Sequence, residues 1–511
     1  GPQTPDMAFG GNWYLDADND YYVAITGTGN TPITKKGPGF LQFKSSAKNM
    51  FAGDITIEDG TFHGIVSLID AGPFGDAANN VCLTRNGTIS FGGGLAGSSN
   101  TLANATFAGG NKWRCNIGNN VDINLASLAR AGGSRGTLML GGTATTYDNF
   151  DNRGRLYVGA WKTPSADPDE NDMSSPCYVN TGLGADTGLA NFCKVNNADG
   201  RISSFGSADP GYATNFPASP AGTEKIQPSA AIILASDKNV WALRTAFGIA
   251  EAGDPTITLG SGGLILNSDV QIDPKVKFGS SGTREAFVYV AGVEYSYMHI
   301  ATLADQLITS GGLTKFGDGI LALAGSSSST LSGDVWVNNG TLRLGHASAL
   351  ASASAIHIER GAVLDIGGNY TLNNAISGLG SITTTSNLLA LGASGSISPG
   401  FSSTNTATLT AEDVDFRGTY YWKYDATTND VIACNTLAFG STATLRMTWI
   451  GSGDAALGPR TLFTYKGSDP TLPAWTISGV SRRSGTVSVD SANKRVMINI
   501  VQSGASIFIF R

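Results

Sequence analysis

Charged residues are scarce in this chain. Asp, Glu, Lys and Arg make up 14% of its 511 residues, against about 25% in an average soluble domain. Hydrophobic residues still reach 41%, which excludes wholesale disorder, because disordered chains combine high charge with few apolar residues. With 33 basic residues and a net charge of -7, the composition argues against a nucleic-acid-binding protein, which needs a basic surface.

Long apolar runs and proline are also lacking. No run of 18 apolar residues occurs, so the sequence predicts no membrane-spanning helix. Proline is present only 18 times and no Gly-X-Y period exists, which excludes collagen. Glycine, in contrast, occurs 67 times, nearly double its usual share of about 7%. Abundant Gly, Ser, Thr and Asn with little charge predicts many short strands joined by tight turns.

Cysteine is limited to five residues with no zinc-type spacing. Cys177 and Cys193 form the most local pair, and we predict a disulfide between them in an oxidising compartment. The alternative is that both are free thiols in the core. No secretory signal peptide opens the chain, and Gly1-Pro2 is what some tag-cleaving proteases leave, so we expect that a signal was removed.

An internal repeat is present without gaps. The segment 34–62 aligns with 314–342 at an offset of 280, with 10 identities in 29 positions. Most differences in the expected strands exchange one apolar residue for another. A looser relative of the unit lies at 253–266. Internal repeats of this kind are typical of solenoids and related arrays.

Each repeat unit has the pattern strand, turn, strand. Ile55 and Ile57 precede a turn at Gly60, and Val335 and Val337 precede one at Gly340. Alternate residues of a strand point to one face, so we expect Ile55 with Val335, and Phe62 with Leu342, to occupy matching inward positions. Turns of this type also join two-residue hairpins, which is the competing interpretation.

Turn glycines recur at intervals of about 20 to 27 residues, from Gly60 to Gly87 and from Gly340 to Gly361. This interval fits one solenoid turn of three short strands. We therefore predict an all-β fold, a parallel β-helix (β-solenoid) with an inserted loop-rich segment and a C-terminal β cap.

The segment 314–345 resembles the autotransporter-associated β-strand repeat. The motif Gly395-Ser396-Ile397-Ser398-Pro399-Gly400 is similar to a strand-and-turn motif that follows such repeats. The resemblance covers about a third of the chain. It implies a passenger-type parallel β-helix, secreted or on a bacterial cell surface, often in large adhesin-like proteins. It implies no catalytic residues. Only 111 residues follow Gly400, which is short for a translocating barrel, so the chain resembles a passenger without its barrel or a relative secreted by another route.

Four segments are expected along the chain. Residues 1–150 form N-terminal rungs, 151–235 the loop-rich insertion, 236–400 the rungs with the clearest repeats, and 401–511 the C-terminal β cap. The insertion holds a dense acidic cluster of Asp167, Asp169, Glu170 and Asp172. Carboxylates of this density are a candidate calcium site, and a solvated loop is the alternative. No other cofactor is expected.

Aromatic residues cluster at 420–424. Tyr420 and Trp422 are candidate glycan-binding residues, because sugars stack on aromatic faces, and burial in the cap is the alternative. No catalytic residues are predicted, because the four histidines have no metal-binding spacing.

Three functions remain open at this point. The first is a non-enzymatic extracellular or cell-surface β-solenoid with a structural or adhesive role. The second is a carbohydrate-binding or carbohydrate-active β-helix, and the third is a self-assembling filament or surface-layer subunit. The expected partners are accordingly an extracellular glycan or surface, or further copies of the chain, with no nucleic acid.

Overall fold

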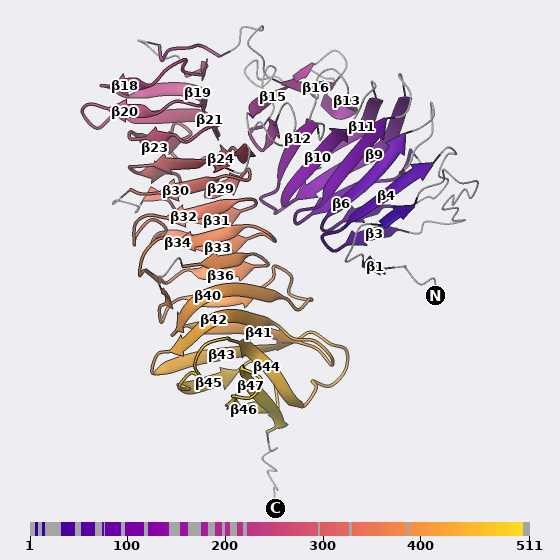
Figure 1. The fold of residues 1–511 in the computed structure, drawn as a ribbon, viewed down its shortest axis with the longest axis vertical. Helices are drawn as coiled ribbons and strands as arrows, with labels where there is room; N and C mark the ends of the chain where they lie inside the picture. Colours follow the sequence, from indigo (N-terminus) through magenta and orange to yellow (C-terminus); the bar gives the residue numbers. More distant parts are fainter. Residues whose placement is uncertain are drawn as a thin grey trace, which may run out of the picture. The chain divides into compact units, whose positions relative to one another are not determined.

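A computed structural model describes residues 6–8, 13–15, 32–45, 53–66, 74–75, 77–93, 98–116, 121–142, 154–161, 175–181, 190–196, 200–204, 212–217, 222–294, 297–325, 330–384 and 388–503. The regular secondary structure of the described residues is almost entirely β-strand (Figure 1). These residues also include a 3-10 turn, η1 (Gly159–Trp161).

The chain divides into two compact units. Unit 1 comprises Gly1–Leu303, Thr314–Leu321 and Asn338–Gly340, and unit 2 comprises Ala304–Leu313, Ala322–Val337 and Thr341–Arg511. Part of the chain has its residues divided between the two units, and it holds the strands β28 (Leu307–Ile308), β29 (Leu313–Phe316) and β30 (Ile320–Leu323).

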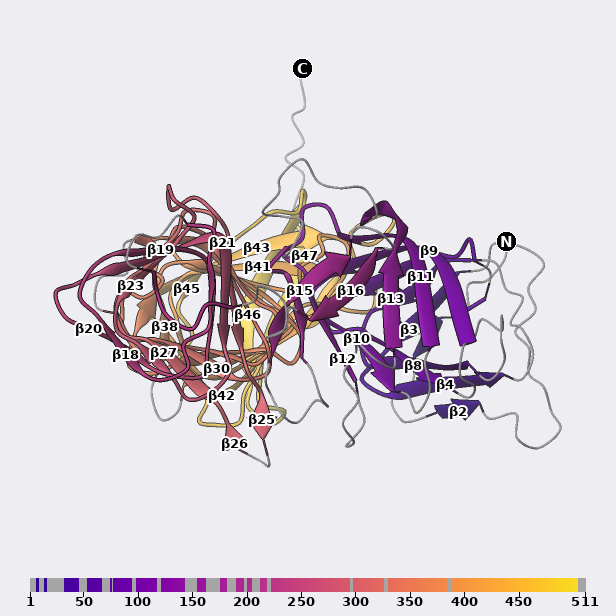
Figure 2. The same ribbon diagram turned by 90° about the horizontal axis from the view of Figure 1, so that it is seen from above.

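The first part of unit 1 is a coil of parallel strands. Its strands are β1 (Asp6–Ala8), β2 (Trp13–Leu15), β3 (Ile33–Lys36), β4 (Phe40–Ser45), β5 (Ile55–Ile57), β6 (Thr61–Val66), β7 (Val81–Thr84), β8 (Thr88–Gly93), β9 (Ser98–Ala108), β10 (Gly110–Asn116), β11 (Val121–Arg130), β12 (Thr137–Gly142), β13 (Gly154–Val158), β14 (Tyr178–Asn180), β15 (Asn191–Asn196) and β16 (Arg201–Ser204). Odd strands from β1 to β13 line one face and even strands from β2 to β14 line the other. Figure 2 shows these two layers, with β9, β11 and β13 in one and β4 and β8 in the other. Antiparallel pairing of β14 with β15, β15 with β16 and β16 with β13 joins the layers at one end.

The second part of unit 1 begins another coil. Its strands are β17 (Lys225–Ile226), β18 (Ile232–Leu234), β19 (Lys238–Thr245), β20 (Ile249–Glu251), β21 (Thr256–Leu266), β22 (Gln271–Ile272), β23 (Lys275–Phe278), β24 (Ala286–Val290), β25 (Val293–Glu294), β26 (Tyr297–Met298) and β27 (Ile300–Leu303). One sheet follows the order β17-β19-β21-β24 and the other β18-β20-β22-β27, all parallel.

Unit 2 is also built from stacked parallel rungs. Its strands are β31 (Gly333–Val337), β32 (Thr341–Leu344), β33 (Ala353–Ile358), β34 (Val363–Ile366), β35 (Thr371–Leu372), β36 (Ala375–Gly378), β37 (Ser381–Thr383), β38 (Leu389–Leu391), β39 (Ser396–Pro399), β40 (Thr408–Phe416), β41 (Thr419–Tyr424), β42 (Val431–Phe439), β43 (Thr442–Trp449), β44 (Gly458–Thr464), β45 (Ala474–Ser478), β46 (Arg483–Asp490) and β47 (Arg495–Gln502). One sheet runs β31-β33-β36-β39-β41-β43-β45, and the other runs β32-β34-β37-β40-β42-β44-β47-β46. Only the last strands of the second sheet are antiparallel, where β47 pairs with β44 and β46.

Parallel pairing confirms the predicted β-solenoid and excludes hairpins at the repeat turns. Around Gly60, β5 pairs with β3 and β7, while β6 pairs with β4 and β8. The prediction of three strands per turn is wrong between Gly340 and Gly361, a segment that the structure describes throughout and that contains only β32 and β33. The interval between turn glycines gives the number of residues in a solenoid turn but not the number of strands in it.

The rungs extend beyond the predicted segment boundaries. Strands β13 and β14, within the expected insertion, continue the coil by parallel pairing with β11 and β12. Likewise β41, β43 and β45, within the expected cap, continue the rungs of unit 2 in parallel. The antiparallel cap is therefore confined to the last strands.

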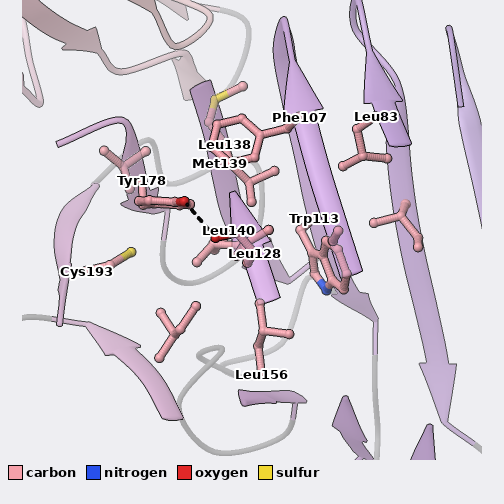
Figure 3. Packing of buried hydrophobic residues seen from close by; sticks show 14 of the residues in the cluster. Leu83, Phe107, Trp113, Leu128, Leu138, Met139, Leu140, Leu156, Tyr178 and Cys193 are labelled. Atoms are coloured by element: carbon pink, nitrogen blue, oxygen red, sulfur yellow. Dashed lines mark hydrogen bonds between the residues drawn. The ribbon is translucent and has the colours of Figure 1, made fainter. Parts of the chain in front are cut away.

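Inward side chains form columns that run from rung to rung. Phe62 lies beside Ile89, Ile89 beside Trp113 and Trp113 beside Leu140, and each is fully buried. Figure 3 shows part of this core from close by, including Trp113 and Leu140. The predicted inward positions are confirmed, because Ile55, Phe62, Val335 and Leu342 are all inaccessible to solvent. Burial of such side chains contributes about 1.5–3 kcal/mol each.

Candidate functional site

An open hollow of about 470 Å³ lies on the outer face of unit 2. Its lining combines aromatic and hydroxyl side chains with one lysine: Trp336, His357, Ser377, Ser398, Gly400, Phe401, Ser402, Ser403, Tyr421, Lys423 and Thr448. These residues are separated by up to 112 positions in the sequence, and the stacking of the rungs brings them together.

The hollow follows one outward column of the sheet that begins with β31. Trp336 is the register partner of His357, His357 of Ser377, and Ser377 of Ser398. Ile397 is the register partner of Tyr420, so the residues that follow them, Ser398 and Tyr421, are neighbours in the same column. Because rungs stack about 4.8 Å apart, the four steps from Trp336 to Tyr421 span about 19 Å.

Three rings form one end of the hollow. The ring of Trp336 stacks on His357 with centroids 4.1 Å apart and on Phe401 with centroids 5.4 Å apart. Phe401 keeps 37% of its surface exposed. The indole Nε1 of Trp336 is buried and has no hydrogen-bond acceptor among the described residues. A buried donor without an acceptor is destabilising by about 1–3 kcal/mol and is uncommon in folded proteins.

The other end carries Tyr421, which is 44% exposed and lies beneath the guanidinium of Arg446, 5.8 Å from the ring centroid. Small serines occupy the two rungs between the aromatic ends, which is why the surface is hollow there. The arrangement is a shallow trough with a polar floor and an aromatic platform at each end.

Lys423 is neutralised within the wall of the hollow. Its Nζ lies 2.8 Å from Asp430 Oδ2 and donates to Pro399 O at 2.7 Å. Asp430 is fully buried, and burial raises the pKa of its carboxyl, whereas the bond from Lys423 acts in the opposite direction. The ammonium is thereby committed to protein acceptors.

A serine, a histidine and an aspartate meet at one edge of the hollow. His357 Nδ1 and Ser377 Oγ are 2.7 Å apart, and His357 Nε2 lies 3.9 Å from Asp334 Oδ2. A catalytic triad requires the carboxylate to hydrogen-bond the ring nitrogen remote from the serine, and 3.9 Å is too long for such a bond. The first coil contains a similar pair in its wall, His63 Nδ1 and Ser90 Oγ at 2.9 Å. We therefore interpret the pair in the hollow as a contact between rungs.

The predicted glycan-binding residues are not at this surface. Tyr420 and Trp422 are fully buried, so their proposed role in stacking on a sugar is wrong. Side chains alternate along β41, which places Tyr420, Trp422 and Tyr424 in the core and turns Tyr421 outward. The sequence showed that aromatic residues occupied both faces of this strand but not which face was exposed.

No disulfide joins Cys177 to Cys193 in the structure, contrary to the prediction. Strands β14 and β15 are antiparallel, with Val179 opposite Phe192. Continuing that register sets Cys177 opposite Lys194, the neighbour of Cys193. Because neighbouring residues on a strand point to opposite faces, the side chains of Cys177 and Cys193 point to opposite faces. Burial raises the pKa of the Cys177 thiol to about 11, which makes it a poor nucleophile.

The acidic residues Asp167, Asp169, Glu170 and Asp172 lie outside the described residues. The structure thus gives no geometry for the predicted calcium site. Across the described segments, no helix is both long and apolar enough to cross a bilayer.

Comparison with curated proteins shows a distant similarity. The chain is 25% identical over 443 residues to the adhesin BmaC autotransporter of Brucella suis biovar 1 (strain 1330). The match covers 69% of this chain but only 12% of the length of that relative. No protein-family profile matches the chain. The β-solenoid and this similarity together fit a passenger-type β-helix.

Proposed function

We propose that this chain is part of a bacterial cell-surface or secreted β-solenoid with an adhesive role. The observation that carries the proposal is the aromatic hollow on the outer face of unit 2. The exterior of a rung needs no large rings for stability, and exposed aromatic clusters with polar surroundings are typical of binding sites. The distant similarity to an autotransporter adhesin supports the same role.

The location can be tested with an antibody raised against the purified chain. We expect the antibody to label intact cells of the source bacterium, or to detect the protein in the medium. Labelling only after permeabilisation, with none in the medium, would contradict the proposed location. An antibody to a cytoplasmic protein serves as the control for cell integrity.

The adhesive role can be tested with beads that carry the purified chain. We expect these beads to adhere to epithelial cells or to immobilised extracellular matrix more strongly than beads blocked with albumin. Equal retention of both kinds of bead on every surface would contradict an adhesive role.

Carbohydrate binding is a second proposal for the same protein, favoured by the aromatic and hydroxyl lining of the hollow. Calcium binding by the acidic cluster at 167–172 and self-association also remain proposals. Calorimetric titration with calcium and sedimentation of the purified chain test these two directly.

A further inference from the structure

We propose that the hollow on unit 2 binds a neutral, linear oligosaccharide that lies along the stacking direction of the rungs. The inference rests on the proposed adhesive function and specifies the ligand class and the residues that recognise it. The ligand would rest on Trp336 and Phe401 at one end and on Tyr421 at the other, above a floor of Ser377 and Ser398.

The aromatic residues define how a sugar would be held. A pyranose ring has a face of C–H bonds and an edge of hydroxyl groups. The C–H face packs on an aromatic ring, which is apolar and bears negative charge on its face. Tyr421 and Phe401 are 44% and 37% exposed, respectively, and they lie at opposite ends of the hollow.

The lining between the rings suits hydroxyl groups. Ser398, Ser402, Ser403 and Thr448 border the hollow, and each side-chain hydroxyl both donates and accepts hydrogen bonds. The unsatisfied Nε1 of Trp336 adds a donor that could find an acceptor in a ligand after a small movement of the ring. Sites with a few polar groups among aromatic walls are typical of small-molecule recognition.

Charge at the hollow favours a neutral sugar over an acidic one. Recognition of a carboxylate or sulfate usually depends on a cation that can bond to it. Lys423, the lysine that lines the hollow, has its Nζ already committed to Asp430 and Pro399, and Arg446 is not among the lining residues.

The length of the column favours a chain of several sugars. Trp336 and Tyr421 are four rung steps apart, about 19 Å at the spacing of a sheet, whereas a single pyranose ring is much shorter. A monosaccharide would contact one platform, and an oligosaccharide of a few units could contact both. We therefore expect affinity to rise with chain length until both platforms are covered.

The repeat provides a variant that the solenoid should tolerate. At the offset of 280, Trp336 corresponds to Thr56 of the first copy. Trp336→Thr thus introduces a residue that the same rung position already accepts, and Tyr421→Ser continues the serine column of Ser377 and Ser398. Phe247→Ser is the matched control, because Phe247 is 41% exposed but belongs to unit 1.

The first measurement is a glycan array that presents neutral, sialylated and sulfated oligosaccharides to the purified full chain. We expect binding to neutral linear oligosaccharides. Calorimetric titration with a tetrasaccharide that binds on the array, and with shorter oligosaccharides of the same series, should show that affinity increases with the length of the sugar chain. Each of Trp336→Thr and Tyr421→Ser should weaken binding at least tenfold, while Phe247→Ser should leave it unchanged.

A fluorescence titration follows the site directly. Binding should alter the tryptophan emission of the wild type, and the change should diminish in Trp336→Thr. Equal melting temperatures of wild type and variants confirm that the fold is retained. If Trp336→Thr unfolds the chain, Tyr421→Ser alone decides the question.

Three results would overturn the inference: no binding to the array, binding restricted to acidic glycans, or neutral binding that neither variant weakens. Its failure is distinguishable from failure of the adhesive role. Wild type and the double variant adhering equally well to cells would refute the hollow as the site and leave adhesion intact. Wild-type binding to neutral glycans without adhesion to cells or matrix would refute adhesion and leave the site intact.

Discussion

The two copies of the repeat, 34–62 and 314–342, bury a lysine in the same manner. In the first copy, the Nζ of Lys35 donates to Gly37 O at 2.6 Å and to Asp59 O at 3.1 Å. The lysine is almost completely buried, yet its carbon chain ends at backbone oxygens. The ammonium thereby satisfies carbonyl groups that the tight turn leaves without a partner.

The second copy repeats this cage and closes it further. The Nζ of Lys315 donates to Gly317 O and Gly319 O at 2.5 Å each and to Asn339 O at 2.7 Å. Burial lowers the pKa of Lys315 to about 7. The pKa of Lys35 is also lowered by burial, which the charge of Asp59 opposes.

Glycines complete the cage in both copies. Gly60 and Gly340 have φ of 68° and 61°, a left-handed conformation that favours glycine. A side chain at either position would also collide with the caged carbonyls. The conserved part of the repeat is therefore the chemistry of its turn.

The outward positions of the two copies differ. Thr56 of the first copy corresponds to Trp336 of the second, although their inward neighbours Ile55 and Val335 are both fully buried. The comparison teaches that the repeat specifies the scaffold, while the outer face can vary without disturbing it. The candidate binding site lies at such a varied position.

The largest effect is expected from an inward charge. Val335→Asp and Ile55→Asp should each destabilise the protein by about 3–5 kcal/mol, because both place an unpaired carboxylate in a packed core. Urea unfolding measures the loss. Thr56→Asp, on the adjacent outward position, is the matched control and should change stability by less than about 1 kcal/mol. Equal losses for Ile55→Asp and Thr56→Asp would refute the assignment of faces.

Low pH should affect stability differently at β6 of the first copy and at its counterpart β32 of the second. His63 corresponds to Arg343, which donates to Asp365 Oδ2 at 2.6 Å. Burial lowers the pKa of His63 to about 4 from an ordinary value of 6.5. Between these pH values the unfolded chain binds a proton that the folded chain does not, so stability falls as the pH falls through this range. The resulting loss of folding stability reaches about 3 kcal/mol near pH 4 and is absent above pH 6.5.

The variant His63→Gln tests this expectation. Its stability should decline less than that of the wild type between pH 6.5 and pH 4, as measured by urea unfolding at each pH. Parallel pH profiles for the two proteins would show that His63 does not titrate as inferred.

Removing the caged lysines should have a moderate effect. Lys315→Met leaves buried carbonyls without donors and should cost about 2 kcal/mol, since each unsatisfied buried group costs about 1–3 kcal/mol and the loss of a buried charge offsets part of this. Lys35→Met should cost less, because its cage holds the ammonium at longer distances to the facing rung. Thermal unfolding of the two variants compares them. A larger loss for Lys35→Met would reverse the proposed ranking.

The sequence predicted the rungs and their inward faces because apolar alternation survives in both copies. Ile55 and Phe62 could be assigned to the core from the period of two residues alone. The sequence could not predict which ring of β41 is exposed, since aromatic residues stand on both faces and only the packed rung distinguishes Tyr421 from Tyr420.

The hollow was also beyond prediction from the sequence. Trp336, His357, Ser377, Ser398 and Tyr421 are 20 to 23 residues apart, and no local motif connects them. Their proximity depends on the register of successive rungs, which varies with the length of each turn. A residue-by-residue register becomes available only when the strands are placed side by side.

The smallest effect is expected at the outer face. Tyr421→Ser should change stability by no more than about 0.5 kcal/mol, because the ring is 44% exposed and the rungs on one side of it already carry serine in the same column. Its neighbour Tyr420→Ser, which empties a buried site, should cost about 3–5 kcal/mol and provides the matched contrast within one strand. Thermal and urea unfolding of both variants measure the difference. Comparable losses at the two positions would show that Tyr421 supports the scaffold, and the separation between a retained turn and a variable face would then fail in this strand.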